Sequence, residues 1–395
     1  MALRVAIVHS FYDSVRPSGE NTQVQAEVQA LDRAGVEVGL FGIHTDDAGG
    51  ECFYRLRSAA RVATGRGRSP LSALDAFSPD LVHVHNLFPN FGRRWVRRLK
   101  VPLVVTLHNF RFVCANGLLF RDGGPCTDCV ARGPWPGLRH RCYRGSRAAT
   151  LPLAVAQLGG PGADPVLARA DSILCLSDRQ REILVGTGIA PERLVDWSNF
   201  LPPPLDPGGD ATVRSGRPRE GCLYVGRLTP EKGAVDLAAS WQGDHVLRVV
   251  GDGPQLGQLH RVAVGRPVEV VGPVPRPMVM DLMSRSAALA LPGGLPDVSP
   301  LVYVEALACG LPVIARQVSD VAARVQRDRA GVVVDEVEEA PDAVTQLVAD
   351  PDLPRRCRAA YEARYTAEAW TERTLDLYGS LARGRTRRPT RSTSG

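Results

Sequence analysis

The stretch Leu291–Ala315, LPGGLPDVSPLVYVEALACGLPVIA, predicts a strand, a loop, a helix and a second strand in direct succession. Residues 292–296 are rich in glycine and proline, so they end the apolar strand before them and form a loop. Ser299 and Pro300 are typical of a helix start, with serine as the N-cap and proline in the first turn. The predicted helix, Leu301–Cys309, ends at a glycine, and the apolar run PVIA follows as a buried strand.

Two carboxylates, Asp297 and Glu305, lie eight residues apart in this stretch, one before the helix and one inside it. Because a helix N-terminus favours negative charge, the loop before this helix is a predicted anion site. Glu305 interrupts the apolar sequence VYVEALA, where an unpaired charge is unfavourable. A helix face exposed to solvent would also explain Glu305, and this stretch alone favours that interpretation.

Two further glycine-rich stretches change that balance. Val225–Gly233, VGRLTPEKG, is a predicted strand end, turn and helix start that carries Arg227 and Lys232. Val249–Gln255, VVGDGPQ, is another transition from strand to loop. All three stretches fall at the carboxyl ends of predicted strands, where open α/β sheets bind ligands.

Together these motifs resemble the retaining glycosyltransferases of family 4, which have the GT-B fold. The family signature has two glutamates separated by seven residues, and Asp297 stands here in place of the first. The rest of the signature, SPLVYVEALACGLPVIA, fits closely, and the resemblance extends over about positions 3 to 380. It implies an α/β chain with two doubly wound, parallel-sheet, Rossmann-like domains that face a central cleft.

The resemblance also implies a reaction, the transfer of a hexosyl group from a UDP- or GDP-sugar to an acceptor hydroxyl. Arg227 and Lys232 are then expected to stabilise the departing diphosphate, so that no catalytic metal is needed. Glu305 is expected to accept the ribose hydroxyls, and Asp297 to contact donor sugar hydroxyls. The helix N-terminus formed by Ser299, Pro300 and Leu301 is expected to add backbone amide donors.

Two residues of the N-terminal half take expected roles from the same resemblance. Gly19 matches a loop glycine that lets a helix start approach the donor phosphates, although a plain turn glycine is the alternative. His108, in VTLHN, matches the position beside the donor sugar. The loop before Gly19 lacks G-x-G-x-x-G, which disfavours a nicotinamide dehydrogenase.

The order of predicted elements divides the chain into domains. Residues 1–200 form the acceptor-side domain, and the linker 201–220 is dense in proline and glycine. Residues 221–365 form the nucleotide-sugar domain. The resemblance implies that a helix over 366–382 crosses back to the first domain. The tail 383–395 has five arginines and no acidic residue, and it is predicted to be disordered.

The first domain is predicted to begin with the strand Leu3–His9 and the helix Glu20–Ala34. The apolar face of this helix is expected to consist of Val24, Val28 and Leu31. Four further strands are predicted after this helix, at residues 36–41, 80–85, 102–108 and 171–176.

Composition excludes several classes of protein. The 395 residues carry a net charge of +6, but the tail accounts for five of these charges, so nucleic-acid binding is not indicated. No run of 18 apolar residues predicts a membrane span, and the start of the chain does not resemble a signal peptide. Nine cysteines, an odd number, favour a reducing cytoplasm over a disulfide framework.

Residues 114–142 form an unusual insertion with the spacing C-x11-C-x2-C-x12-C, made by Cys114, Cys126, Cys129 and Cys142. Four thiolates with a central C-x2-C pair suit a structural tetrahedral zinc ion, which would hold a segment rich in glycine and proline. Four free thiols, or three thiols with His140, remain alternatives. A redox role is disfavoured because no thioredoxin-like context surrounds the pair.

Residues 90–100, NFGRRWVRRLK, place Phe91, Trp95 and Leu99 on one face of a predicted helix, with five basic residues around them. One interpretation is core packing with a basic rim. The other is a peripheral helix on the anionic inner face of the plasma membrane.

The acceptor is not indicated by the sequence, because the loops that form such sites vary freely. A polysaccharide or lipid-linked oligosaccharide is the first expectation, and a small secondary metabolite is the second. Three other functions remain open: a non-catalytic nucleotide-sugar-binding relative, a scaffold that uses the basic segments, and a nucleotide-sugar epimerase. Intact Arg227, Lys232 and Glu305 argue against the first of these.

Overall fold

The structure is a computed structural model that describes residues 3–12, 18–50, 53–201, 219–294 and 298–386. Its contacts divide the chain into two compact units. The first unit comprises Met1–Gly117, Thr127–Trp197 and Trp370–Gly395, and the second comprises Leu118–Cys126 and Ser198–Ala369. Most of the predicted linker and the end of the predicted tail lie outside the described residues.

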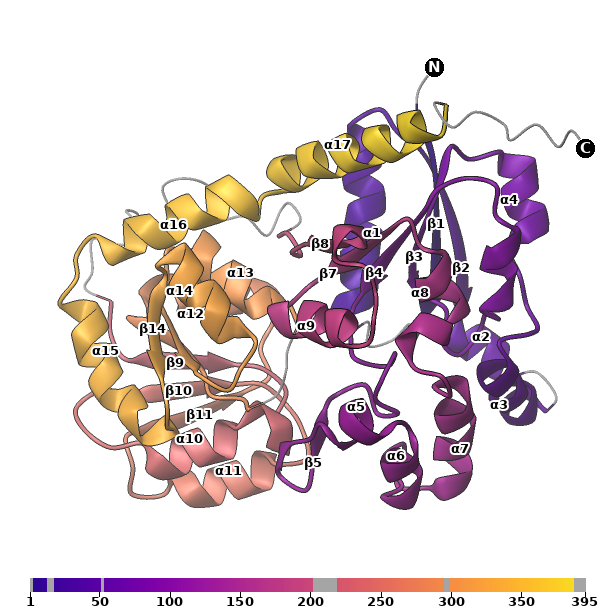
Figure 1. Ribbon diagram of the computed structural model, residues 1–395. Coiled ribbons are helices and arrows are strands. Elements are labelled where there is room, and N and C mark those ends of the chain that lie inside the picture. Colours follow the sequence, from indigo (N-terminus) through magenta and orange to yellow (C-terminus); the bar gives the residue numbers. More distant parts are fainter. Residues whose placement is uncertain (1–2, 13–17, 51–52, 202–218, 295–297, 387–395) are drawn as a thin grey trace, which may run out of the picture. The chain divides into compact units, whose positions relative to one another are not determined.

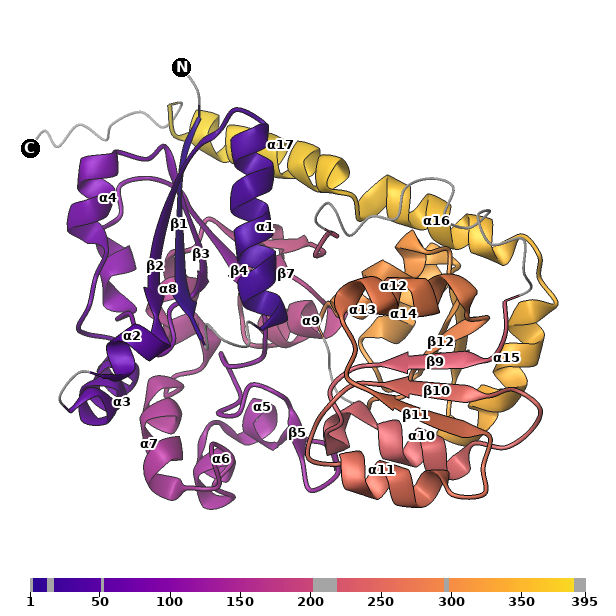
Figure 2. The same cartoon turned by 180° about the vertical axis from the view of Figure 1, so that it is seen from behind.

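The first unit is built on a six-stranded sheet with the order β2-β1-β3-β4-β7-β8, in which every neighbouring pair is parallel. The strands are β1 (Arg4–Phe11), β2 (Glu37–His44), β3 (Leu81–Asn86), β4 (Leu103–Leu107), β7 (Ser172–Cys175) and β8 (Leu194–Asp196). The five strands predicted for this domain are confirmed, and β8 was not predicted. Both faces of the sheet are covered, with α1 (Gly19–Arg33) on one face and α8 (Pro165–Arg169) on the other (Figure 2).

The remaining helices of this unit lie in the connections between strands, except α17, which follows the last strand of the chain (Figure 1). They are α2 (Thr45–Gly49), α3 (Tyr54–Thr64), α4 (Leu71–Phe77), η1 (Arg94–Arg98), α5 (Asp128–Arg132), α6 (Trp135–Arg139), α7 (Arg147–Ala156), η2 (Pro161–Ala163), α9 (Asp178–Gly186), η3 (Pro191–Arg193) and most of α17 (Ala367–Thr386). The hairpin strands β5 (Phe120–Arg121) and β6 (Gly124–Pro125) belong to the second unit.

Helix α1 begins where the Ser18 side chain accepts a hydrogen bond from the Asn21 amide. Its buried face differs from the predicted one, because Val28 is only partly buried and Glu27 is almost fully buried. Glu27 lies three residues after Val24 and four before Leu31, so it occupies the same helical face as those two buried side chains. The helical period of the buried face was predicted correctly, but the residue buried between Val24 and Leu31 is Glu27 and not Val28.

The second unit is built on six parallel strands with the order β11-β10-β9-β12-β13-β14. The strands are β9 (Cys222–Val225), β10 (Leu247–Val250), β11 (Val268–Gly272), β12 (Ala288–Leu291), β13 (Val313–Arg316) and β14 (Gly331–Val334), all of which were predicted. Figure 1 shows α10 (Ala234–Ser240) and α11 (Leu256–Ala263) on one side of this sheet, with α12 (Arg276–Arg285), α13 (Leu301–Ala308) and α14 (Val321–Asp328) on the other. The unit is completed by η4 (Pro230–Lys232), η5 (Val337–Glu339), α15 (Ala340–Val348) and α16 (Leu353–Arg364).

In each sheet, the direction in which successive strands are added reverses once. This switch point lies between β1 and β3 in the first sheet and between β9 and β12 in the second. Crevices at the carboxyl ends of the strands beside such a switch point are where open α/β sheets bind ligands. The fold thus marks one such edge in each unit.

Helix α13 follows the predicted boundaries but not the predicted cap. Pro300 is the N-cap residue, and the Ser299 hydroxyl instead accepts a hydrogen bond from the Asn199 amide at 3.3 Å. A neighbouring segment of the chain therefore uses the oxygen that was expected to cap the helix.

The segment 90–100 is not an amphipathic surface helix. Only Arg94–Arg98 is helical, as a short 3-10 turn, and Phe91 and Trp95 are buried in the core of the first unit. Arg93, from the basic rim, pairs with Asp164 instead of facing solvent alone. The membrane interpretation of this aromatic stripe is wrong because its aromatic side chains already pack against the sheet. No helix in the described part of the chain is long and apolar enough to cross a bilayer.

The loops after β9 and β10 touch through their backbones, and glycine permits the contact. Gly251 has φ = +151°, and a Cβ atom there would lie 1.8 Å from the carbonyl oxygen of Gly226. Only a backbone shift could relieve such an overlap. The strand-end loops of the second unit therefore depend on the absence of a side chain at Gly251.

We predict that Gly251→Ala lowers the free energy of unfolding by about 2 kcal/mol or more, because it combines a steric overlap with an unfavourable φ. Gly257→Ala is the matched control, since Gly257 is helical and its added Cβ meets only the end of the Arg261 side chain at 3.9 Å. The control is expected to raise stability by up to about 1 kcal/mol. Denaturant unfolding of both variants measures this, and equal stability would contradict the role of Gly251.

Candidate functional site

Three loops meet at the switch point of the second sheet. They follow β9 (226–233), β10 (251–255) and β12 (292–300), of which 295–297 lie outside the described residues. A Cβ atom on Gly233 would lie 3.1 Å from the carbonyl oxygen of Pro292, and one on Gly293 would lie 3.0 Å from that of Glu231. The structure thus brings together the three stretches that the sequence singled out.

Arg227 and Lys232 both lie in the loop after β9. The Arg227 side chain is 67% exposed, and its guanidinium lies 3.8 Å from the Glu231 carboxylate. That carboxylate also accepts a hydrogen bond from the Thr229 hydroxyl at 2.7 Å, which orders the turn. Lys232 ends the 3-10 turn η4 and is partly buried. Two cationic side chains therefore lie in the loop that contacts residues 292–293.

Glu305 is 2% exposed, so the interpretation as a solvated helix face is wrong. Its carboxylate pairs with the guanidinium of Arg276, the first residue of α12. Partial burial lowers the pKa of Arg276. Sequence reasoning missed Arg276, although a lone arginine between two prolines after a strand, VPRPM, was a visible signal. A buried charge without a partner is strongly unfavourable, so Glu305 needs this pairing or an equivalent one.

The start of α13 lies at the same sheet edge. The Asn199 side-chain amide donates to the Ser299 carbonyl oxygen at 2.8 Å, so Asn199 holds both the carbonyl oxygen and the hydroxyl of Ser299. Pro300 has no N–H group, and the first amide donors of the helix begin at Leu301. Asp297 lies outside the described residues.

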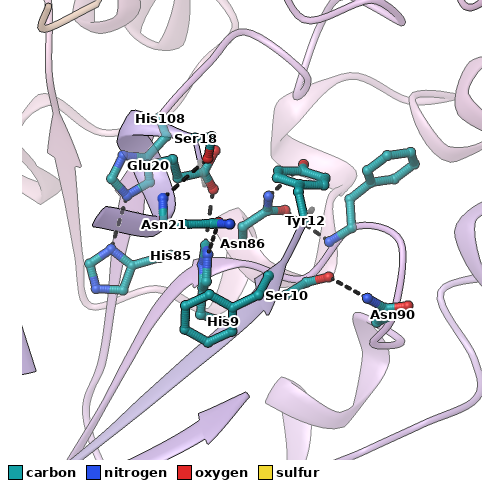
Figure 3. Close-up of polar contacts among 12 residues, drawn as sticks. His9, Ser10, Tyr12, Ser18, Glu20, Asn21, His85, Asn86, Asn90 and His108 are labelled. Carbon is teal, nitrogen blue, oxygen red and sulfur yellow. Dashed lines mark hydrogen bonds and ion pairs between the residues drawn. The ribbon is translucent and has the colours of Figure 1, made fainter. Parts of the chain in front are cut away.

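The switch point of the first sheet carries a cluster of buried histidines (Figure 3). His85 Nδ1 lies 2.9 Å from His108 Nε2, which links the ends of β3 and β4. His83 is held by the Tyr378 hydroxyl at 2.6 Å and by the Thr106 hydroxyl at 2.8 Å. His108 is partly exposed, whereas the other two are buried.

Burial keeps these rings neutral. It lowers the pKa of His83 and of His108 to about 3, and it lowers the pKa of His85 as well. It raises the pKa of Glu27 to about 8, and the Glu27 carboxyl lies 3.4 Å from His85 Nε2. Burial therefore favours the uncharged forms of the groups in this cluster.

A second polar group surrounds the start of α1 (Figure 3). His9 Nε2 lies 3.1 Å from the Asn21 side-chain oxygen, and its pKa is lowered to about 4 mainly by burial. Burial raises the pKa of Glu20 to about 7. The Asn86 side chain donates to the Tyr12 hydroxyl at 2.7 Å.

Gly19 is the first residue of α1, next to this polar group. Residues 13–17 of the loop before it lie outside the described residues. The predicted contact of Gly19 with phosphates stays a prediction.

The only group of three or more metal-ligating side chains at ligand spacing, within the described ranges, is Glu27, His83 and His85. Both ring nitrogens of His83 already have hydroxyl partners, so this group is accounted for as a hydrogen-bonded network.

The predicted zinc ligands do not gather in that way. Cys114, Cys129 and Cys142 belong to the first unit and form no group at ligand spacing, whereas Cys126 belongs to the second unit. None of the four takes part in a disulfide. The structural zinc site stays a prediction that the structure does not support.

A cavity of about 150 Å³ adjoins His108 within the first unit. Most of its lining is apolar, and it includes Leu87, Phe88, Leu107, Phe112, Leu153, Ala156 and Leu167. Its polar lining includes His108, Asn109 and Gln157. The Gln157 side-chain oxygen is buried without a hydrogen-bond partner among the described residues, so a ligand hydroxyl could donate to it.

Solved structures share this fold across nearly the whole chain. Sucrose-phosphate synthase from Thermosynechococcus elongatus superimposes with a TM-score of 0.66 at 20% identity, covering 97% of this chain and 100% of that one. Anabaena Alr3699/HepE in complex with UDP and glucose superimposes with a TM-score of 0.62 at 16% identity, covering 96% and 100%.

The curated sequence relatives match over a smaller part of their own length. D-inositol 3-phosphate glycosyltransferase 1 of Catenulispora acidiphila is 27% identical over 344 residues, which are 78% of this chain and 74% of that protein. The chain spans between a quarter and about half of the length of several other curated relatives that it matches.

Two family models match the two halves of the chain. The model described as glycosyl transferase 4-like domain matches residues 18–196, and the model described as glycosyl transferases group 1 matches residues 216–364. The chain therefore belongs to the glycosyltransferases that join a 4-like domain to a group 1 domain, with the GT-B fold.

Proposed function

We propose that the protein transfers a hexosyl group from a nucleoside-diphosphate sugar to an acceptor hydroxyl, with retention of anomeric configuration. One observation carries the proposal. The loop bearing Arg227 and Lys232 is in backbone contact with the loop that leads to α13 and the buried Glu305. A diphosphate is bound by cations and by helix amides, and a ribose by a hydrogen-bond acceptor. This sheet edge carries two cations, the N-terminus of α13 and the carboxylate of Glu305.

The chemistry assigned to Arg227 and Lys232 follows from the leaving group. Negative charge develops on the departing diphosphate, so preorganised cations beside it lower the barrier. Arginine offers a planar fork for two phosphate oxygens, and lysine offers a compact charge. We assign this role to protein cations and expect no catalytic metal ion.

Glu305 is the proposed partner of the ribose hydroxyls. Its carboxylate is held by Arg276, whose own side chain is 42% exposed. The arginine therefore gives the buried carboxylate a cationic partner before the nucleotide binds. Ribose hydroxyls can then donate to a carboxylate oxygen that is already buried. Asp297 and His108 keep their proposed roles at the donor sugar.

The cavity beside His108 is the proposed acceptor subsite. Its apolar lining and the unpartnered Gln157 oxygen suit an acceptor that joins an apolar group to hydroxyls. A lipid-linked or aromatic acceptor fits this chemistry better than a purely polar glycan. Synthesis of a glycoconjugate or polysaccharide is therefore our first proposal, and glycosylation of a secondary metabolite is the second.

We predict that Arg227→Ala and Lys232→Ala each lower donor turnover by about 100-fold or more, since each removes a charge that faces the leaving group. The assay incubates a panel of UDP- and GDP-sugars with enzyme alone and follows the release of nucleoside diphosphate. Arg355→Ala is the control, because Arg355 is an 86% exposed arginine on α16 of the same unit. Wild-type turnover in both test variants would contradict the assignment of Arg227 and Lys232 to the diphosphate.

Glu305→Gln is expected to weaken binding of the free nucleoside diphosphate by about 10-fold or more, because a charged acceptor is lost. Calorimetry measures the affinity. Glu269→Gln, at an exposed glutamate that pairs with Arg248, should leave it unchanged. An unaltered affinity in Glu305→Gln would show that the ribose binds elsewhere.

The cavity is tested with pairs of glycosides that carry the same sugar on a methyl or an octyl group. Wild-type enzyme should show the lower KM for the octyl member. Ala156→Leu, which fills the cavity, should raise that KM and spare the methyl member and donor hydrolysis. Ala163→Leu, at an exposed position outside the lining, is the control. Equal KM values for both members in the wild type would contradict the proposed subsite.

A further inference from the structure

Three side chains of the first unit form a line from the interior to the cavity. The Glu27 carboxyl lies 3.4 Å from His85 Nε2, and His85 Nδ1 lies 2.9 Å from His108 Nε2. His108 lines the cavity and is the partly exposed end of the line. Its Nε2 atom is used by His85, so Nδ1 is the ring nitrogen left for a ligand (Figure 3).

The inner end of the line requires a proton. Glu27 Oε2 and His85 Nε2 are both buried, and neither has a hydrogen-bond partner within standard geometry among the described residues. Without a proton between them, two lone pairs would face each other at this buried contact. The proton belongs either to the carboxyl or to the ring, and the two arrangements have opposite consequences at His108.

If Glu27 is a neutral acid, it donates to His85 Nε2, and His85 Nδ1–H then donates to His108 Nε2. His108 must then carry its own proton on Nδ1, where it donates to a ligand. If Glu27 is a carboxylate and His85 is neutral, His85 carries its proton on Nε2 and accepts from His108 Nε2–H. His108 Nδ1 is then a bare acceptor that could act as a base.

We propose that Glu27, as a neutral acid acting through His85, holds His108 in the Nδ1–H tautomer, so that His108 donates a hydrogen bond to its ligand. Ionisation of Glu27 reverses every hydrogen bond in the line and converts His108 Nδ1 into an acceptor. Glu27 and His85 are positioning residues in this account. The identity of the ligand as a sugar hydroxyl rests on the proposed function, whereas the tautomer does not.

The surroundings of Glu27 favour the neutral acid. The titratable groups that face it are His83 and His85 on β3 and the Tyr378 hydroxyl on α17, with His9 and His108 farther along the cluster. Burial depresses the pKa of each of these histidines, so the carboxyl gains no cationic partner from them. Its neighbour on α1, Gln23, hydrogen-bonds the carboxyl and lowers its pKa, but burial is the larger effect and raises it.

Glutamine at position 27 separates this proposal from a purely structural role. The side-chain amide of Glu27→Gln can donate to His85 Nε2 as the neutral acid does, but it cannot ionise. Glu27→Ala removes the donor. Glu20→Gln is the matched control, because Glu20 is a second carboxyl of α1 with a raised pKa that lies outside the line.

Nitrogen-15 NMR of the full chain with labelled histidine reports the tautomer, and His108→Gln assigns the resonance. Near pH 6.5, His108 should be Nδ1–H in the wild type, Glu27→Gln and Glu20→Gln. As the pH rises through about 8, the wild type and Glu20→Gln should change to Nε2–H, whereas Glu27→Gln should not. The pH profile of donor hydrolysis should lose its alkaline limb near that pH in Glu27→Gln alone.

Two results would overturn the proposal. One is an Nε2–H tautomer of His108 in the wild type near pH 6.5. The other is an alkaline change that persists in Glu27→Gln. If Glu27→Ala fails to fold, the comparison of glutamine with the wild type still decides. The NMR result stands even if no donor is turned over, so failure of the proposed function is distinguishable from failure of this inference.

Discussion

The candidate nucleotide site depends on close backbone contacts between loops that follow parallel strands. Parallel strands of one sheet end at the same edge, and in the second unit the order of strands turns back between β9 and β12. The loops after β9, β10 and β12 meet there only because Gly251, Gly233 and Gly293 carry no side chain. The positions of Arg227, Lys232 and Glu305 follow from these contacts, since each lies in one of these loops or in the helix that follows.

The two units have the same architecture but accommodate their buried carboxyl groups in different ways. The second unit pairs a buried carboxylate with the guanidinium of Arg276. In the first unit, burial favours neutral forms of both the carboxyls and the histidines. A charged site suits a diphosphate, and a neutral hydrogen-bonding site beside an apolar cavity suits sugar and acceptor hydroxyls.

The sequence was informative where a local pattern decides the structure. The strand residues 81–85 and the run PVIA are buried on both faces, so their largely apolar sequence identifies them. Arg276 was visible as a lone arginine between two prolines, but its pairing with Glu305 could not be predicted, because only the tertiary fold brings the two together. The contact of Asn199 with Ser299 could not be predicted for the same reason. Glu27 was overlooked because periodicity treats every charged residue as exposed. The stripe at Phe91 and Trp95 was ambiguous for the opposite reason, since a surface helix and a core turn share that pattern.

The central claim is that the protein activates a nucleoside-diphosphate sugar for transfer with retention. Proton NMR of the enzyme with its donor in water, or with a simple glycoside as acceptor, tests it most directly. The account predicts that the first sugar product has the anomeric configuration of the donor and appears in step with the nucleoside diphosphate. A product of inverted configuration, or no release of nucleoside diphosphate from any UDP- or GDP-sugar, would contradict it.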